Sequence, residues 1–490
     1  MKKLNYHHTA LRLPGALLLL LTCFAAPLAA QEVVSEEMQD RQSRFILALG
    51  LPYTPDYDVQ NYSITYTTTD AFGQPDTASG LVAIPVASDD FIFPLGVYNH
   101  GTVPDRESVP SRAGERERLV VAAIATKGYV MLAPDYIGLG DSRGVHPYVH
   151  AATEASAGRD MIIAVKKWLA ERELVAVNEQ LFITGYSQGG HATAALHRDI
   201  ATNPTDDGLT VTSATHLSGP YSISDVMANT IFQEGNPTLP GYIAYTYISY
   251  NYVYGLYDDL GQAFVEPYLT PIRRFANEEI NLDQFNGQLD QLLNANNARL
   301  EAIFQDSVRN VLAEGDPTDP INMALADNDT YDWAPEEPTL IFYCTQDEQV
   351  PFRNAILADS VMRANGSESV TLASGGPLSH GGCIVPAITA TVEFWAPLSE
   401  IVNSLGEPVR RPEFSVSPNP VYAGGELSLN GLPAARAPYT LYDSAGRSAL
   451  RGVTDGDGRI RLPAHLRGGL HILRLGLQDG SSVVRRVVVR

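Results

Sequence analysis

The stretch from Ile183 to Leu196, ITGYSQGGHATAAL, constrains the fold more than any other part of the chain. Ser187 has a glycine at both second neighbours, Gly185 and Gly189, which gives the pattern G-x-S-x-G. The apolar run QLFIT before it predicts a buried strand, and the proline-free segment GHATAALHRDIA after it predicts a helix. A serine at a sharp bend between a strand and a helix is exposed as a nucleophile must be. A glycine-rich turn with no catalytic serine is the alternative interpretation.

Strand-like and helix-like segments alternate on both sides of this bend. VQNYSITYTTTD and TASGLVAIPV predict an initial antiparallel pair, because polar and apolar residues alternate in both. From PLGVYNHG onward, predicted strands are separated by predicted helices such as TEASAGRDMIIAVKKWLAEREL. This alternation predicts an α/β fold in which helices cover both faces of a mostly parallel sheet.

The alternation is interrupted over about residues 221–335. GYIAYTYISYNYVYGLYDDL carries seven tyrosines, and the segment after it has apolar residues at helical intervals. An insertion of this length between two sheet strands predicts a helical cap over the strand ends. The tyrosines either pack between this cap and the core or line an amphipathic substrate pocket.

A catalytic serine requires two partners, because its hydroxyl barely ionises at neutral pH. An imidazole must take the proton, and a carboxylate must orient that imidazole. In sheets with this type of bend, the chain order is serine, then acid, then histidine. The predicted strand TLIFYC leads into TQDEQVP with Asp347, and SVTLASGG leads into PLSHGGC with His380. Glu348 is the alternative acid.

Two backbone N–H groups are candidates to stabilise the oxyanion that would develop during attack by Ser187. Gln188 follows the serine at a predicted helix start, and Thr102 follows His-Gly in the loop NHGTVP after a predicted strand. The segment GVHPYVH places His146 and His150 in a loop that could line the site. Structural roles are expected for the two histidines of the helix after Ser187, His191 and His197.

These motifs together resemble the α/β-hydrolase superfamily, and within it the secretory-lipase-like serine esterases. The likeness covers about residues 59–400 and is carried by YNHGT, LAPDYIGLGDS with HPYVH, GYSQGGHATAAL and the D-x-x-V-P loop, which favours Asp347 over Glu348. The resemblance implies hydrolysis of small-molecule or lipid esters, with Ser187, Asp347 and His380 as the triad. It implies no cofactor and no metal. The cap matches no motif of the family.

The chain has 490 residues and a net charge of −22, and we expect two domains and a secreted protein. Residues 1–30 read as a signal peptide, with Lys2, Lys3 and Arg12 before an apolar run. No later run of apolar residues is long enough to predict a transmembrane span. So acidic a surface repels nucleic acid, which we exclude as a partner.

Two cysteines remain after removal of the signal peptide. Cys344 stands three residues before Asp347, and Cys383 stands three residues after His380. Pairing is permitted in an oxidising compartment, and a disulfide would join the loops that carry acid and base. Two free buried thiols are the alternative.

The composition changes near residue 412. Residues 413–490 carry ten arginines and six acidic residues, whereas 31–412, the predicted catalytic domain, is strongly acidic. Short segments rich in glycine and proline predict a small β-sandwich. SPNP, LYDSAGR and GLHILRL resemble the C-terminal sorting domain of the type IX secretion system. That likeness implies the type IX machinery as a partner and release or attachment at the cell surface; a carbohydrate-binding or adhesion module is the alternative.

Three functions follow from these motifs. A secreted serine ester hydrolase, a lipase or carboxylesterase, is favoured. A serine peptidase of the prolyl-oligopeptidase type uses the same sheet and the same chain order, but only about thirty mature residues precede the sheet here, too few for a propeller. A surface binding protein on a hydrolase fold without catalysis is the third.

Overall fold

The computed structural model describes residues 31–87, 91–205, 207–233, 239–403, 414–431, 436–476 and 482–490. The signal peptide expected over residues 1–30 and the domain boundary expected at 412/413 lie outside the described residues. In the ranges that are described, no helix combines the length and the apolar character that a membrane crossing needs.

The main sheet has ten strands in the order β1-β2-β3-β5-β4-β6-β7-β8-β9, with β10 paired to β4. Strands β1, β2, β3 and β5 pair antiparallel, and the pairings from β5 through β4 to β9 are parallel. The bounds are β1 Val33–Gln42, β2 Asp58–Thr69, β3 Pro75–Val86, β4 Phe91–Asn99, β5 Val130–Pro134, β6 Ala176–Tyr186, β7 Ser213–Leu217, β8 Thr339–Tyr343, β9 Val370–Ser374 and β10 Val402–Asn403. The predicted α/β fold is confirmed.

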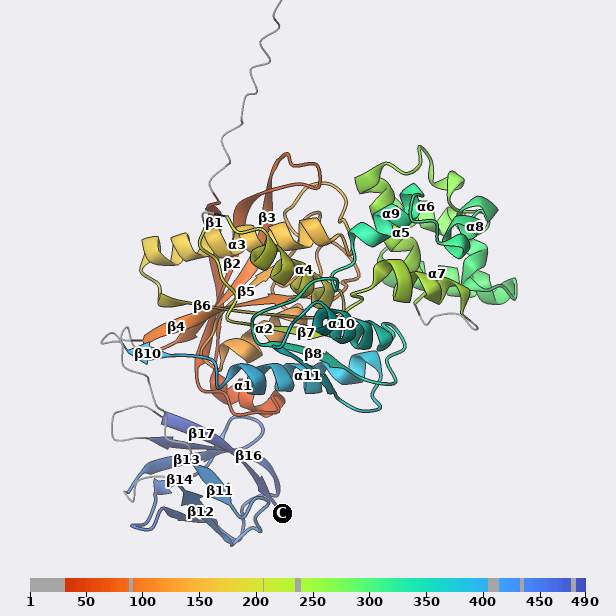
Figure 1. The fold of residues 1–490 in the computed structure, drawn as a ribbon. Helices are drawn as coiled ribbons and strands as arrows, with labels where there is room; N and C mark the ends of the chain where they lie inside the picture. The colour runs from red at the N-terminus through yellow and green to blue at the C-terminus, as the bar shows by residue number, and fades with distance from the viewer. Residues whose placement is uncertain are drawn as a thin grey trace, which may run out of the picture. The chain divides into compact units, whose positions relative to one another are not determined.

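Helices cover both faces of this sheet (Figure 1). Apolar side chains of α3 and α4 share one buried cluster with the sheet, and α10 continues the cover on that face. Side chains of α2 and α11 form the cluster on the other face. Because both faces are covered, all five residues of β5 are buried. The bounds are α1 Arg44–Gly50, α2 Glu117–Ala125, α3 Ala151–Arg172, α4 Gln188–Thr202, α10 Arg353–Ala364 and α11 His380–Trp395.

The edge strand β1 was not expected from the sequence. Its segment VVSEEMQDRQ carries four charged residues, and no residue of the strand is fully buried. An edge strand that faces solvent needs no apolar stripe, and charged side chains there discourage pairing with another chain. The usual alternation of polar and apolar residues is therefore missing.

A helical cap lies between β7 and β8 and is drawn in green in Figure 1. In α7, Phe285, Leu289 and Leu293 recur every four residues and are buried in a core of the cap's own. Tyr148 and Val149, from the loop after β5, belong to the same core. The elements are η1 Ile223–Met227, η2 Ala228–Phe232, α5 Gly241–Tyr254, η3 Leu260–Gln262, α6 Leu269–Ala276, α7 Leu282–Ala295, η4 Leu300–Ile303, α8 Asp306–Glu314 and α9 Pro320–Asp327.

The C-terminal residues form two small antiparallel sheets, β11-β12-β15 and β14-β13-β16-β17. Leu427 and Ile460 from one sheet and Leu441, Leu473 and Val487 from the other are buried in a single cluster. Two sheets that share one apolar core make a β-sandwich, as predicted. The bounds are β11 Ser415–Ser417, β12 Glu426–Asn430, β13 Pro438–Tyr442, β14 Ser448–Val453, β15 Arg459–Arg461, β16 Gly469–Gly476 and β17 Ser482–Val489.

Candidate active site

Ser187 occupies the bend between β6 and α4. Its backbone has φ +62° and ψ −123°, a strained conformation for a residue that is not glycine. The two flanking glycines are needed because the backbone is crowded. A Cβ atom on Gly189 would lie 1.9 Å from the carbonyl oxygen of Asn99, and one on Gly185 would lie 2.2 Å from that of Gly189. The bend therefore tolerates no side chain at either position.

The Ser187 hydroxyl meets the imidazole of His380, the first residue of α11. The distance from His380 Nε2 to Ser187 Oγ is 2.9 Å, and both residues are buried. The hydroxyl of Tyr186 donates to the carbonyl oxygen of His380 at 2.6 Å. The last residue of β6 thus fixes the start of α11 beside the bend.

Of the two candidate acids, Asp347 is the one that contacts the imidazole. His380 Nδ1 donates to Asp347 Oδ2 at 2.7 Å, and Asp347 Oδ1 accepts from the backbone N–H groups of Gln349 and Val350. Glu348 instead accepts from the backbone N–H of His380 at 3.0 Å. Both carboxylates therefore hold His380, one by its ring and the other by its backbone.

Of the two predicted oxyanion donors, Gln188 lies at the bend and Thr102 lies in the loop after β4. Gln188 is the first residue of α4, and its N–H belongs to the first turn, where no carbonyl of the helix accepts it. The loop that carries Thr102 passes close by, because a Cβ on Gly101 would lie 3.7 Å from the Cβ of Ser187. The Thr102 hydroxyl hydrogen-bonds to the Tyr148 hydroxyl at 2.9 Å.

The cysteines are joined in a disulfide between Cys344 and Cys383, 39 residues apart. Cys344 follows β8 directly, and Cys383 lies in the first turn of α11. Both are fully buried. The bond therefore links the strand that leads to Asp347 with the helix that begins at His380.

A cavity of about 300 Å³ opens beside Ser187 and Gln188. Its wall is mostly apolar, and the cap contributes Ile223, Met227 and Ile231. The clustered tyrosines divide between the two predicted roles. Tyr242 and Tyr247 line the cavity, whereas the ring of Tyr245 stacks on that of Tyr148 with centroids 4.4 Å apart, and Tyr250 donates to the carbonyl of Val149.

Three solved structures are similar to this chain in fold. A Legionella pneumophila protein that has been assigned as a hydrolase is 28% identical, with a TM-score of 0.67 over 75% of this chain and 98% of its own. The rice cell wall degrading esterase LipA from Xanthomonas oryzae is 24% identical, with a TM-score of 0.64 over 75% and 98%. Candida antarctica lipase A, in its closed state, is 14% identical, with a TM-score of 0.54 over 78% and 86%.

The chain has an α/β-hydrolase fold. No protein-family model matches it, and no curated protein sequence matches it.

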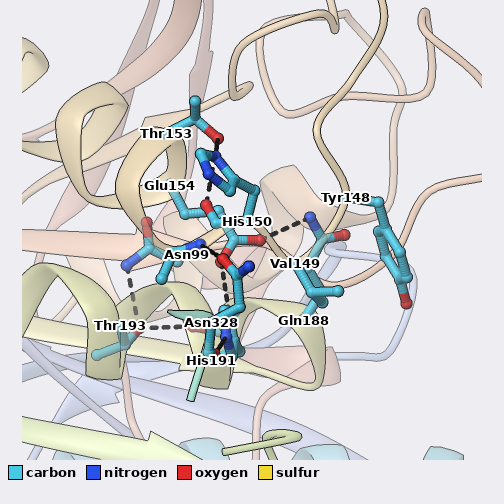
Figure 2. A network of polar contacts seen from close by, with 12 residues as sticks. Asn99, Tyr148, Val149, His150, Thr153, Glu154, Gln188, His191, Thr193 and Asn328 are labelled. Carbon is cyan, nitrogen blue, oxygen red and sulfur yellow. Dashed lines mark hydrogen bonds and ion pairs between the residues drawn. The ribbon is translucent and has the colours of Figure 1, made fainter. Parts of the chain in front are cut away.

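The fold also holds a buried polar network that the sequence did not indicate (Figure 2). Gln188 Nε2 lies 2.9 Å from His146 Nε2 and 3.0 Å from Glu154 Oε1. The other oxygen of Glu154 lies 2.6 Å from His191 Nδ1, and His191 Nε2 lies 2.8 Å from the carbonyl oxygen of Asn328. His191 thus has the structural surroundings expected for it. His146 contacts the side chain of Gln188 and is not among the residues that line the cavity beside Ser187. Glu154 carried no signal, because one glutamate near a helix start is ordinary.

Proposed function

We propose that the protein is a serine hydrolase of carboxylic esters, a carboxylesterase or lipase. The observation that carries the proposal is the continuous chain of hydrogen bonds from Ser187 through His380 to Asp347, at a strained bend beside an apolar cavity. A buried imidazole with one ring nitrogen on a carboxylate and the other on a hydroxyl is arranged to take a proton from that hydroxyl.

In this proposal Ser187 Oγ attacks the ester carbonyl while His380 Nε2 accepts the serine proton. His380 then gives that proton to the leaving alcohol oxygen, and the acyl group stays on Ser187. A water molecule that is deprotonated by His380 then attacks the acyl carbonyl, and His380 returns this proton to Ser187 Oγ as the acid leaves. Asp347 keeps the imidazole in the correct tautomer and stabilises its cationic form. The backbone N–H groups of Gln188 and Thr102 would bind the oxyanion of each tetrahedral intermediate.

The structural neighbours support this class of reaction, since they include an esterase and a lipase. The wall of the cavity beside Ser187 is mostly apolar, which favours an uncharged acyl group over a charged group as the part of the substrate that binds there. Pockets for small ligands have volumes of about 300–1,000 Å³, and this cavity lies at the lower end of that range. We therefore expect short and medium acyl chains to be preferred over long ones.

A panel of aryl esters from acetyl to palmitoyl, assayed on residues 31–412, tests the proposal. We expect hydrolysis that is fastest for a short or medium chain, and Ser187→Ala should lower kcat by about 10⁶, since the triad acts as a unit. A proline aryl amide in the same panel tests the peptidase alternative. Undiminished hydrolysis by Ser187→Ala, or cleavage of the amide alone, would refute the proposal.

We further propose that the C-terminal β-sandwich directs the protein through the type IX secretion machinery to the cell surface or the medium. The support is its sequence resemblance to sorting domains, together with a buried core made of its own residues.

A further inference from the structure

We propose that Glu154 is a positioning residue, which holds Gln188 in place and connects this oxyanion donor to the cap. The inference rests on the proposed function and adds a residue to it. Glu154 lies in the first turn of α3, is fully buried and does not line the cavity beside Ser187. It acts through Gln188 and touches no reacting atom.

The side-chain amide of Gln188 has its two N–H groups used by two acceptors. One is Glu154 Oε1 at 3.0 Å, and the other is His146 Nε2 at 2.9 Å. His146 accepts there because its Nδ1–H donates to the carbonyl oxygen of Ile137 at 2.8 Å. Burial lowers the pKa of His146 to about 3, which keeps the ring neutral and Nε2 free to accept.

The second oxygen of Glu154 continues the network toward the cap (Figure 2). It contacts His191 Nδ1 at 2.6 Å, and His191 Nε2 donates to the carbonyl oxygen of Asn328 at 2.8 Å. Asn328 ends the cap helix α9, and its side-chain oxygen accepts from the N–H of Ala151 at the start of α3. Its Nδ2 donates to the hydroxyl of Tyr254, on α5. The end of the cap helix α9 is therefore hydrogen-bonded to His191 on α4 and to the start of α3.

A second route of hydrogen bonds leads from Gln188 through His146 to the cap. The carbonyl oxygen of His146 accepts from the hydroxyl of Ser249 on α5 at 3.2 Å, and the same hydroxyl accepts from the N–H of Tyr148 at 3.1 Å. Gln188 thus lies between two bonded routes to the cap. Apart from Tyr254, the residues of both routes are buried, where a polar group that loses its partner finds no water to replace it.

The position of Gln188 matters because its N–H must meet the oxyanion. The serine side of this peptide is held by backbone bonds, from Ser187 N–H to the carbonyl of Leu217 and from Gly190 N–H to the carbonyl of Ser187. The backbone of Ser187 is strained, so further contacts are needed at Gln188 to hold the peptide between Ser187 and Gln188 in place. The side-chain amide of Gln188, which donates to Glu154, provides these contacts.

Substitution of Glu154 tests the proposal, with kcat expressed per active site titrated by an aryl phosphonate. Glu154→Ala should lower kcat roughly 10- to 100-fold with little change in KM, since a displacement of about 1 Å can cost about 10² in rate. Glu154→Gln should restore most of the rate. Its amide oxygen can accept from Gln188, and its amide nitrogen can donate to His191 Nδ1. Glu171→Ala, at an exposed carboxylate of the same helix, is the matched control.

A purely structural role would lower the melting temperature and leave kcat per titrated site unchanged, which would overturn the proposal. So would a Glu154→Gln enzyme as slow as Glu154→Ala, because hydrogen bonding would then not be the cause. If Glu154→Ala does not fold, Gln188→Ala takes its place, since it keeps the backbone N–H. The proposal predicts a lower kcat for it, and a wild-type kcat would overturn the proposal.

A double-mutant cycle shows whether Glu154 acts through Gln188. In the Gln188→Ala background, Glu154→Ala should cause little further loss of kcat, because the two residues form one unit. Losses that multiply would overturn the proposal. Ser187→Ala is measured alongside. If that variant still hydrolyses the ester, the proposed function fails; if it is inactive while Glu154→Ala matches Glu171→Ala, only the positioning role fails.

Discussion

At the scale of single residues, two adjacent carboxylates hold His380 in different ways. Asp347 bonds to the imidazole Nδ1, and Glu348 bonds to the backbone N–H. Only the ring contact selects the tautomer that leaves Nε2 free to accept the Ser187 proton. The two acids should therefore differ in their effect on the rate.

Asp347→Asn should lower kcat by about 10⁴, because an amide nitrogen at that position favours the wrong imidazole tautomer. Glu348→Gln should have a far smaller effect, since its amide oxygen still accepts from the backbone of His380. Steady-state kinetics with an aryl ester distinguishes the two. A larger loss for Glu348→Gln would transfer the acid's role to Glu348.

His150 illustrates how burial of a titratable group links stability to pH. Burial, reinforced by nearby His191 and opposed by Asp327, lowers the pKa of His150 from 6.5 to about 4. Between these values the unfolded chain binds more protons than the folded chain. The stabilising contribution is therefore complete above pH 6.5 and is lost progressively as the pH falls toward 4.

His150→Asn should make the free energy of unfolding less dependent on pH. For the two pKa values of His150, the wild-type loss between pH 7 and pH 5 from this residue is about 2 kcal/mol. Urea unfolding at both pH values measures it, and the same substitution at exposed His465 is the control. Equal pH dependence in wild type and His150→Asn would contradict the prediction.

At the scale of elements, the disulfide joins the end of β8 to the first turn of α11. Asp347 follows β8 by four residues, and His380 begins α11. A bond between these elements limits how far the two catalytic candidates can separate. Its effect should therefore appear both in stability and in catalysis.

The double variant Cys344→Ala, Cys383→Ala should lower the free energy of unfolding by about 4 kcal/mol, the chain-entropy value for a loop of roughly 40 residues. It should also lower kcat, because a looser start of α11 misplaces His380. Denaturant titration and ester kinetics at the same temperature measure both effects. An unchanged unfolding free energy would show that the bond does not constrain the chain.

At the scale of the whole molecule, the C-terminal β-sandwich buries a core of its own residues, and the cavity beside Ser187 includes none of them. Deleting residues 413–490 should leave a purified enzyme with unchanged kcat/KM. In the native host the truncated protein should accumulate in the periplasm, because the resemblance assigns export to the deleted part. Immunoblots of periplasm, cell surface and medium give the distribution. Normal export of the truncated protein would refute this role.

The sequence by itself determined the α/β class, the strand-bend-helix around Ser187 and the order of serine, acid and histidine. These follow from local patterns, because an apolar strand, a pair of glycines and a loop residue after a strand can be recognised within a few positions. The β-sandwich was predictable for the same reason, as its short strands are separated by glycine and proline. The edge strand β1 was not, because its exposed residues have no pattern to preserve.

Only the tertiary structure decided which distant polar groups meet. Glu154 and Gln188 are 34 residues apart, and His191 and Asn328 are 137 apart, within or directly after helices whose local sequences would be equally acceptable without these contacts. The family resemblance favoured Asp347 over Glu348, but the separate contacts of the two acids with His380 depend on how the loop after β8 faces α11. A hydrogen bond between two distant elements leaves no periodic or local pattern in the sequence. Its partners can therefore be identified only in the folded chain.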